Sequence, residues 1–375
     1  MAITRIGTPA IADQRGINFR NILINGDQSI AQRGTSFTGL QNSPVYGIDR
    51  WAYRRAGTFT SATFSMTQST DVPTGQGFAK SLKIDCTAAE ASLPAGVYAQ
   101  FAQYIEGQML QYLKKGTSSA ESLTMSFWVK SNKTGTYIAE LRDRDNSRNI
   151  CKSYTINSAN TWEKKTITFA GDTTGAFDND NASSLQVNWN LCAGTDFTSG
   201  TLQTSWGSEV AANRAVGQVN LADSTSNEWY ITGVQLEVGQ VASDFEFLPY
   251  DVTLRRCQRY YHRLYRKEDA TANNACSFGI YGIYYTNTNV FFAGSHPVAM
   301  RATPSLDMAS GTNYYRLYRA GALDQFDDFT LQTTNNRTNR YTWEANNTTD
   351  VSGTQGQTGI VRGDADTYVG FDAEL

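Results

Sequence analysis

The chain has 375 residues, of which 40% are hydrophobic and 18% charged, with a formal net charge of −3 at pH 7. Aromatic residues make up 12% of the sequence, which is too many for a disordered chain. The near-zero charge gives no bulk field to attract nucleic acid, and no apolar run approaches the roughly 18 residues that cross a bilayer. We therefore expect a mainly β protein with no nucleic-acid partner and no membrane insertion.

Residues 1–20 show no hydrophobic period and include Thr, Ile, Pro and Gly in no regular order. Such a segment cannot bury enough apolar surface to fold alone. We interpret it as an extended N-terminal docking arm that becomes ordered against another protein or a sister subunit.

Alternating strand patterns dominate residues 21–250. In the stretch 122–130 the side chains that point to one side are hydrophobic: Leu123, Met125, Phe127 and Val129. Similar alternation recurs at 184–191 and 234–238. Proline is absent between Pro94 and Pro249, as expected for central strands, because proline cannot donate to the ladder. Many short strands without long helices between them predict a jelly-roll β-sandwich over 21–250.

Two segments of this domain break the pattern. Residues 103–114 are expected to begin as a strand and to end in a short helix over 109–113, which Gly116 stops. Residues 192–223 form a long polar stretch with almost no pattern. A loop of that length in a compact domain is usually functional or part of an interface.

The amino-acid composition changes at residue 251, so we expect residues 251–375 to form a second, smaller β-rich domain. Its first segment is basic and aromatic, with these residues predicted to form a subunit interface: Arg255, Arg256, Arg259, Tyr260, Tyr261 and Tyr265. Arginine and tyrosine also suit nucleic acid. With an overall charge of −3, a contact between subunits is the preferred interpretation.

The five cysteines are odd in number and form no CxxC pair. A chain of this length needs no disulfide framework, so we expect free thiols and folding in a reducing cytoplasm. The two histidines, His262 and His296, are not at metal-ligand spacing from any cysteine, which argues against zinc.

Several motifs resemble known proteins. Residues 19–28, Phe-Arg-Asn-Ile-Leu-Ile-Asn-Gly-Asp-Gln, resemble the opening strand of carbohydrate-binding jelly rolls. Residues 30–34 and 46–51 look like tail-fibre and other structural proteins of bacteriophages, marine ones especially. Further pieces match that group in order: 123–131, 161–165, 231–239, 244–250, 257–261, 297–304 and 372–375.

This resemblance implies a phage virion protein that carries a carbohydrate-binding-module-like jelly roll and is assembled in the bacterial host cytoplasm. The first hypothesis is a tail or capsid fibre that attaches to a host-surface glycan. It would be a homo-oligomer, expected as a trimer, and would contact other virion proteins through its N-terminal arm. The alternatives are a capsid decoration (cement) protein without receptor binding and a polysaccharide depolymerase.

Two groups of carboxylates could supply a catalytic pair: Glu140, Asp143 and Asp145 across one turn, and Asp178 and Asp180 in another. The four aspartates, Asp143, Asp145, Asp178 and Asp180, could also bind a metal ion. Glycoside hydrolysis needs two carboxylates that face each other, about 5–10 Å apart. These residues lie in Asn- and Gly-rich turn sequence, where Asp often bonds its own backbone, so we expect no enzyme activity. The same oxygens suit a structural calcium ion, which jelly rolls similar to this one often hold. A solvated turn remains the favoured interpretation, and no cofactor is expected.

Glycan binding requires exposed aromatic rings beside amide and carboxylate side chains. The best candidates are Trp206, in the long polar segment, and Trp162, just before a strand. Trp128 and Trp189 alternate within strands and could lie on either face of a sheet. For each tryptophan, packing in the core or an interface is the competing interpretation.

Overall fold

The computed structural model describes residues 19–41, 44–266, 276–332, 334–345, 351–363 and 367–375. The predicted docking arm, apart from Phe19 and Arg20, lies outside these ranges. The chain forms two compact units that divide between Thr253 and Leu254, three residues beyond the expected boundary. Each unit is described below by itself.

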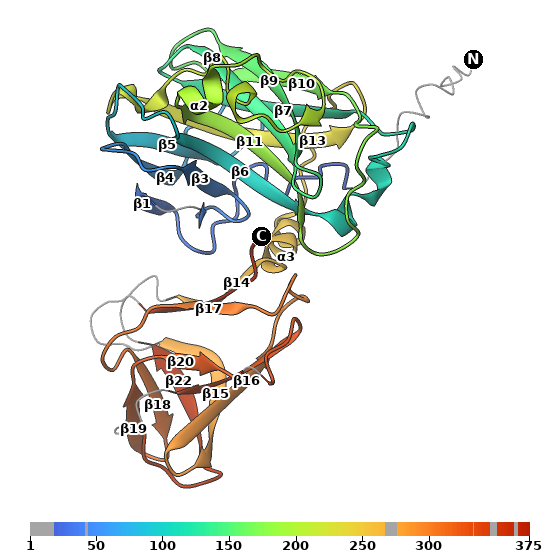
Figure 1. Ribbon diagram of the computed structural model, residues 1–375. Helices are drawn as coiled ribbons and strands as arrows, with labels where there is room; N and C mark the ends of the chain where they lie inside the picture. Colours follow the sequence, from blue (N-terminus) through green and yellow to red (C-terminus); the bar gives the residue numbers. More distant parts are fainter. Residues whose placement is uncertain (1–18, 42–43, 267–275, 333, 346–350, 364–366) are drawn as a thin grey trace, which may run out of the picture. The chain divides into compact units, whose positions relative to one another are not determined.

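The first unit contains two antiparallel sheets (Figure 1). The six-stranded sheet has the order β1 (Ser36–Leu40), β4 (Thr63–Ser69), β5 (Ser81–Ala88), β13 (Glu228–Val238), β7 (Leu123–Ser131) and β10 (Glu163–Phe169). The seven-stranded sheet has the order β12 (Gly207–Ser208), β9 (Arg148–Ile156), β8 (Gly135–Asp143), β11 (Ser183–Ala193), β6 (Tyr98–Glu106), β3 (Ala52–Ala56) and β2 (Val45–Tyr46).

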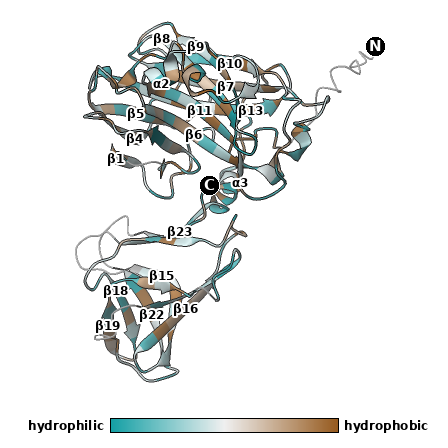
Figure 2. Ribbon diagram, in the orientation of Figure 1, coloured by the Kyte–Doolittle hydropathy of each residue, from teal (hydrophilic) through white to brown (hydrophobic). Residues whose placement is uncertain are grey.

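The hydrophobic core of this unit lies between the inward faces of the two sheets. Phe127 of β7 is fully buried and packs edge-on against Trp189 of β11, with ring centroids 5.7 Å apart. Trp51 stacks on Phe101 of β6 at 4.7 Å. Figure 2 shows hydrophobic and hydrophilic positions mixed along the strands, because hydrophobic side chains of each sheet face the core and polar side chains point outward. The predicted jelly-roll β-sandwich is therefore confirmed.

Short helical turns fill the irregular segments of the first unit. Strand β6 passes into two 3-10 turns, η1 (Gly107–Met109) and η2 (Gln111–Leu113), which confirms the predicted change from strand to helix. Gly116 then adopts a left-handed backbone conformation, with φ of 83°. The long segment after β11 contains α2 (Thr195–Thr198), η3 (Ala211–Asn213) and η4 (Leu221–Asp223).

The second unit is also β-rich, as predicted. Helix α3 (Tyr250–Gln258) precedes a three-stranded sheet of β14 (Tyr261–Arg266), β23 (Tyr368–Asp372) and β17 (Ser305–Met308). A seven-stranded sheet has the order β19 (Ala322–Phe326), β18 (Tyr315–Arg319), β22 (Thr358–Gly363), β15 (Cys276–Thr286), β16 (Asn289–Ser295), β21 (Arg340–Ala345) and β20 (Phe329–Leu331). Its core is aromatic, centred on Phe292, Phe329, Trp343 and Phe371.

Cys86, Cys151 and Cys192 are buried thiols that form no disulfide. No helix among the described residues is long and apolar enough to cross a membrane.

Candidate functional site

Trp162, one of the two predicted glycan-binding residues, lies on the outward face of the six-stranded sheet, directly before β10. Its indole is half-buried, and its Nε1–H donates a 2.9 Å hydrogen bond to Asp71 Oδ1. The ring lies 6.1 Å from that of Tyr230 on β13, at an interplanar angle of 68°. One indole edge is therefore fixed within the protein, while part of the ring remains exposed to solvent.

A lysine connects these aromatic rings. Lys130 Nζ lies 4.2 Å from the centroid of Tyr230 and 5.7 Å from that of Trp162, and it forms an ion pair with Asp71. Burial alone would raise the pKa of Asp71, but hydrogen bonds from Lys130 and Trp162 outweigh it and hold this pKa below its usual value. The carboxylate is thus charged at neutral pH, about half-exposed, and able to accept further hydrogen bonds.

Trp128 belongs to the same surface, although the sequence could not assign it to a face. It lies between Thr232 of β13 and Lys164 of β10 in the sheet register, and its side chain is half-buried. Its neighbour Phe127 points into the core, so alternation directs Trp128 outward. Together these side chains form what we call the Trp162 surface: Asp71, Trp128, Lys130, Trp162 and Tyr230.

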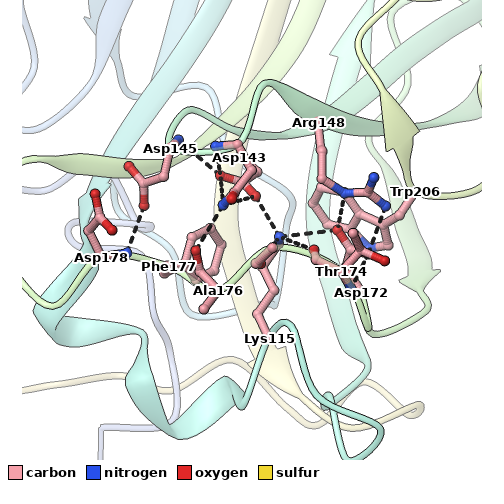
Figure 3. A network of polar contacts seen from close by, with 12 residues as sticks. Lys115, Asp143, Asp145, Arg148, Asp172, Thr174, Ala176, Phe177, Asp178 and Trp206 are labelled. Atoms are coloured by element: carbon pink, nitrogen blue, oxygen red, sulfur yellow. Dashed lines mark hydrogen bonds and ion pairs between the residues drawn. The ribbon is translucent and has the colours of Figure 1, made fainter.

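Trp206, the other predicted glycan-binding residue, lies in a different polar network, just before β12 (Figure 3). Its Nε1–H donates a 2.8 Å hydrogen bond to the carbonyl of Ala170, and Lys115 Nζ lies 5.4 Å from its ring centroid. The indole is half-buried and packs against the core. These contacts indicate that Trp206 packs within the protein and does not offer its ring as a stacking surface for a sugar.

Lys115 is the centre of that network, and its ammonium group is almost completely buried. It lies 2.5 Å from Asp143 Oδ2 and 3.1 Å from Asp172 Oδ2, and it donates to the carbonyl oxygens of Thr174 and Gly175 at 3.0 and 2.6 Å. Figure 3 shows the lysine between the two carboxylates. The ammonium group therefore forms ion pairs with both carboxylates from a position surrounded by oxygen atoms.

Arg148 completes the neutralisation of Asp172. Its Nε and Nη2 contact the two carboxylate oxygens at 2.8 and 2.9 Å. Burial would raise the pKa of Asp172, but the hydrogen bonds from Arg148 and Lys115 more than offset this effect and lower the pKa.

The four predicted metal-binding aspartates do not converge on one point. Asp143 is buried and accepts from Lys115 and from the amide of Asn146, whereas Asp145 accepts a 3.0 Å hydrogen bond from the backbone N–H of Asp178. Asp180 is exposed and accepts from the backbone N–H of Ala182. Among the described residues, no three His, Cys, Asp or Glu side chains form a group that could hold a metal ion. The observed hydrogen bonds are those of turns.

The long segment after β11 covers the outward face of the seven-stranded sheet, a role that the sequence did not reveal. Arg214 makes a bidentate ion pair with the fully buried Glu140 of β8, with distances of 2.8 and 2.9 Å. Burial would raise the pKa of Glu140, but Arg214 and two asparagine side chains lower it to about 2. Neighbouring Gln100, Asn188 and Asn190 on this face are at most 1% exposed. This sheet face is therefore occupied by the chain itself.

The predicted interface residues differ in exposure. Tyr260 and Tyr261 are fully buried and Tyr265 is 8% exposed, and the Tyr261 hydroxyl donates to Asp307 Oδ2 at 2.8 Å. The prediction that these three rings contact a sister subunit is wrong, because they are already part of the interior of the chain.

The three arginines of that prediction lie closer to solvent. Arg255 is exposed on α3, and Arg256 and Arg259 are half-buried. Their role in an interface stays a prediction.

Comparison with known proteins found no matching family model and no matching curated protein. Similar solved structures include the enzymatically active domain of bacteriophage CBA120 tailspike protein 4, at 17% identity and a TM-score of 0.31. That match covers 59% of this chain and 22% of the tailspike chain, so this chain spans about a fifth of that relative.

Carbohydrate-binding modules form a second group of similar structures. The family 11 module of a Clostridium thermocellum cellulase is 12% identical, with a TM-score of 0.28, and the match covers 54% of this chain and 95% of the module. The module TmCBM61, solved in complex with β-1,4-galactotriose, is 11% identical, with a TM-score of 0.29 and coverage of 59% and 99%.

Proposed function

We propose that this chain is a non-enzymatic structural protein of a bacteriophage virion, a tail or capsid fibre that attaches to a glycan on the host surface. It would assemble in the host cytoplasm as a homo-oligomer, for which the sequence predicts three copies. Its N-terminal arm would contact other virion proteins. The ordered phage-like motifs of the sequence support the virion assignment.

The observation that carries glycan binding is the Trp162 surface. Two half-buried tryptophans lie on the outward side of the six-stranded sheet: Trp128 on β7, and Trp162 directly before the neighbouring strand β10. Sugar rings stack on indole faces, and their hydroxyl groups bond to charged or amide groups in the plane of the ring. Asp71 and Lys130 supply such groups beside Trp162.

Binding of purified host-surface polysaccharide and its oligosaccharides tests this assignment. We expect Trp128→Ala and Trp162→Ala each to weaken oligosaccharide binding about tenfold, equivalent to ~1.4 kcal/mol, because each removes a stacking surface. Trp206→Phe is the matched control, since Trp206 lies in a different network, and it should bind as the wild type does. Equal affinity of all three variants and the wild type would place the binding site elsewhere.

The same incubation distinguishes attachment from hydrolysis. We expect no oligosaccharide release, whereas a depolymerase would release fragments with time. Gold-labelled antibody on intact particles tests the virion assignment separately. Label on tail or capsid fibres is expected, and a uniformly labelled capsid with no fibre label would favour the cement protein.

A further inference from the structure

Strand β15 is the central strand of the seven-stranded sheet in the second unit, yet one of its faces is apolar and exposed. Tyr281, Ile283 and Tyr285 are 68%, 49% and 60% exposed, whereas Tyr284 between them is 1% exposed. Strict alternation therefore directs three large side chains to solvent. A sheet face that stays in water normally carries polar residues at these positions.

Apolar side chains continue across the neighbouring strands in register. Tyr318 of β18 pairs with Leu323 of β19 and with Ile360 of β22, and Ile360 pairs in turn with Tyr281. On the other side of β15, Ile283 pairs with Phe291 of β16. The result is a contiguous apolar surface, here called the Tyr281 face: Tyr281, Ile283, Tyr285, Phe291, Tyr318, Leu323 and Ile360.

These side chains are not part of the core of the unit. The core contains the alternate residues on the same strands, such as Tyr284, Leu317 and Val361. Tyr285 stacks on Phe291 with ring centroids 4.9 Å apart and an interplanar angle of 15°, so the two rings form a flat pair. Contiguous exposed patches of this kind mark interaction sites, unlike single exposed apolar residues.

Opposite charges flank the Tyr281 face. Arg316 and Arg362 are paired across β18 and β22, one row from the Tyr318–Ile360 pair, and the Arg362 guanidinium lies 4.2 Å from the Tyr318 ring centroid. Glu344 of β21 is paired with Phe291, on the opposite side of β15. One edge of the surface thus carries two arginines, and the other carries Glu344, with the exposed Arg340 further along the same face of β21.

A second copy of the same chain matches this arrangement. When two such surfaces meet with their edges reversed, the arginine edge of one copy lies against Glu344 of the other while the apolar residues cover one another. Both the hydrophobic and the charged parts of the surface are then complementary to themselves, as a contact between identical chains requires.

We propose that the Tyr281 face binds a second copy of this chain. The proposal rests on the self-association included in the proposed function, and its aromatic residues come from this face instead of the buried Tyr260, Tyr261 and Tyr265. Because both copies use the same face, the contact joins the chains in pairs and does not by itself give three copies. It lies on a different unit from the Trp162 surface, so self-association and glycan binding can fail independently.

Light scattering on the full chain tests the proposal. The wild type should have at least twice the 41.4 kDa protomer mass. Ile283→Lys should weaken self-association at least about tenfold, because it places a charge in the apolar contact. Val210→Lys is the matched control, since Val210 of the first unit is 48% exposed against 49% for Ile283. That control should keep the wild-type mass.

Charge reversal identifies the partner as another copy. Arg316→Glu should weaken association about tenfold, and adding Glu344→Arg to the same chain should restore it to within about threefold. A monomeric wild type, or a double variant weaker than the single one, would overturn the proposal. So would an Ile283→Lys variant that keeps its mass but no longer binds a monovalent oligosaccharide, because that result would make this face a glycan platform.

Discussion

At the scale of single residues, the first unit holds two sets of buried ion pairs inside the chain. Lys115 is enclosed by Asp143 and Asp172, and Arg214 by Glu140. A buried charge without a partner would cost several kcal/mol, so these residues depend on one another even though each ion pair contributes little net stability. Asp143, one of the four aspartates that resemble metal ligands in the sequence, is in fact a partner of Lys115.

Replacing Lys115 tests this dependence. Lys115→Met should lower the free energy of unfolding by about 3–5 kcal/mol, because it leaves Asp143 and Asp172 buried without their shared cation. Chemical denaturation measures the loss. Lys114→Met is the control in the adjacent position, since Lys114 is 46% exposed and pairs with Glu121 at the surface, and it should cost less than about 1 kcal/mol. Similar losses in both variants would contradict the buried-cation role.

Removal of divalent metal ions tests the alternative of a structural calcium ion. Because Lys115 and Arg148 together already neutralise Asp143 and Asp172, we expect EDTA to leave the thermal midpoint unchanged. A midpoint that falls with EDTA and recovers with added Ca²⁺ would show that a calcium ion contributes to stability.

At the scale of strands, the alternation of hydrophobic residues in the sequence correctly predicted which side chains face the core. The type of residue did not predict which side chains are exposed. The pattern around Phe127 correctly assigned which side chains face the core. It could not show that Trp128 and Trp162 are neighbours, because strand pairing is non-local. The density of tyrosine around Tyr260 suggested exposure, but a tyrosine ring is equally suited to a core in which its hydroxyl finds a partner.

A pair of substitutions on adjacent positions of β7 measures the face assignment. Phe127→Ala should lower the free energy of unfolding by about 3–5 kcal/mol, since it removes a fully buried ring and leaves a cavity beside Trp189. Trp128→Ala removes a larger side chain from the outward face and should cost less than Phe127→Ala. A loss below about 1 kcal/mol for Phe127→Ala would mean that the assignment of faces is reversed.

At the scale of the whole molecule, the two units differ in which groups titrate near neutral pH. Both histidines of the chain, His262 and His296, lie in the second unit. They are 8% and 7% exposed, and their rings lie 5.8 Å apart beside the ring of Phe371. Tyr341 also contacts His296, and burial raises the pKa of this tyrosine to about 12, so it remains neutral. Mild acid should therefore act first on the second unit.

The stability of the second unit should fall as the pH falls from about 6.5 to about 4. Burial lowers the pKa of both imidazoles from 6.5 to about 4, and for His296 the nearby His262 adds to the effect. The unfolded chain consequently binds more protons than the folded one within this window, so stability is fully present above pH 6.5 and is progressively lost below it. Each histidine should lower the free energy of unfolding by about 2 kcal/mol at pH 5 relative to pH 7.

Denaturation curves at both pH values measure this difference. They are followed through Trp343, which is the one tryptophan of the sequence in this unit. In His296→Phe the difference should shrink by about half, because one of the two buried imidazoles is gone. An unchanged difference in that variant would show that carboxyl groups, and not the buried histidines, cause the acid sensitivity.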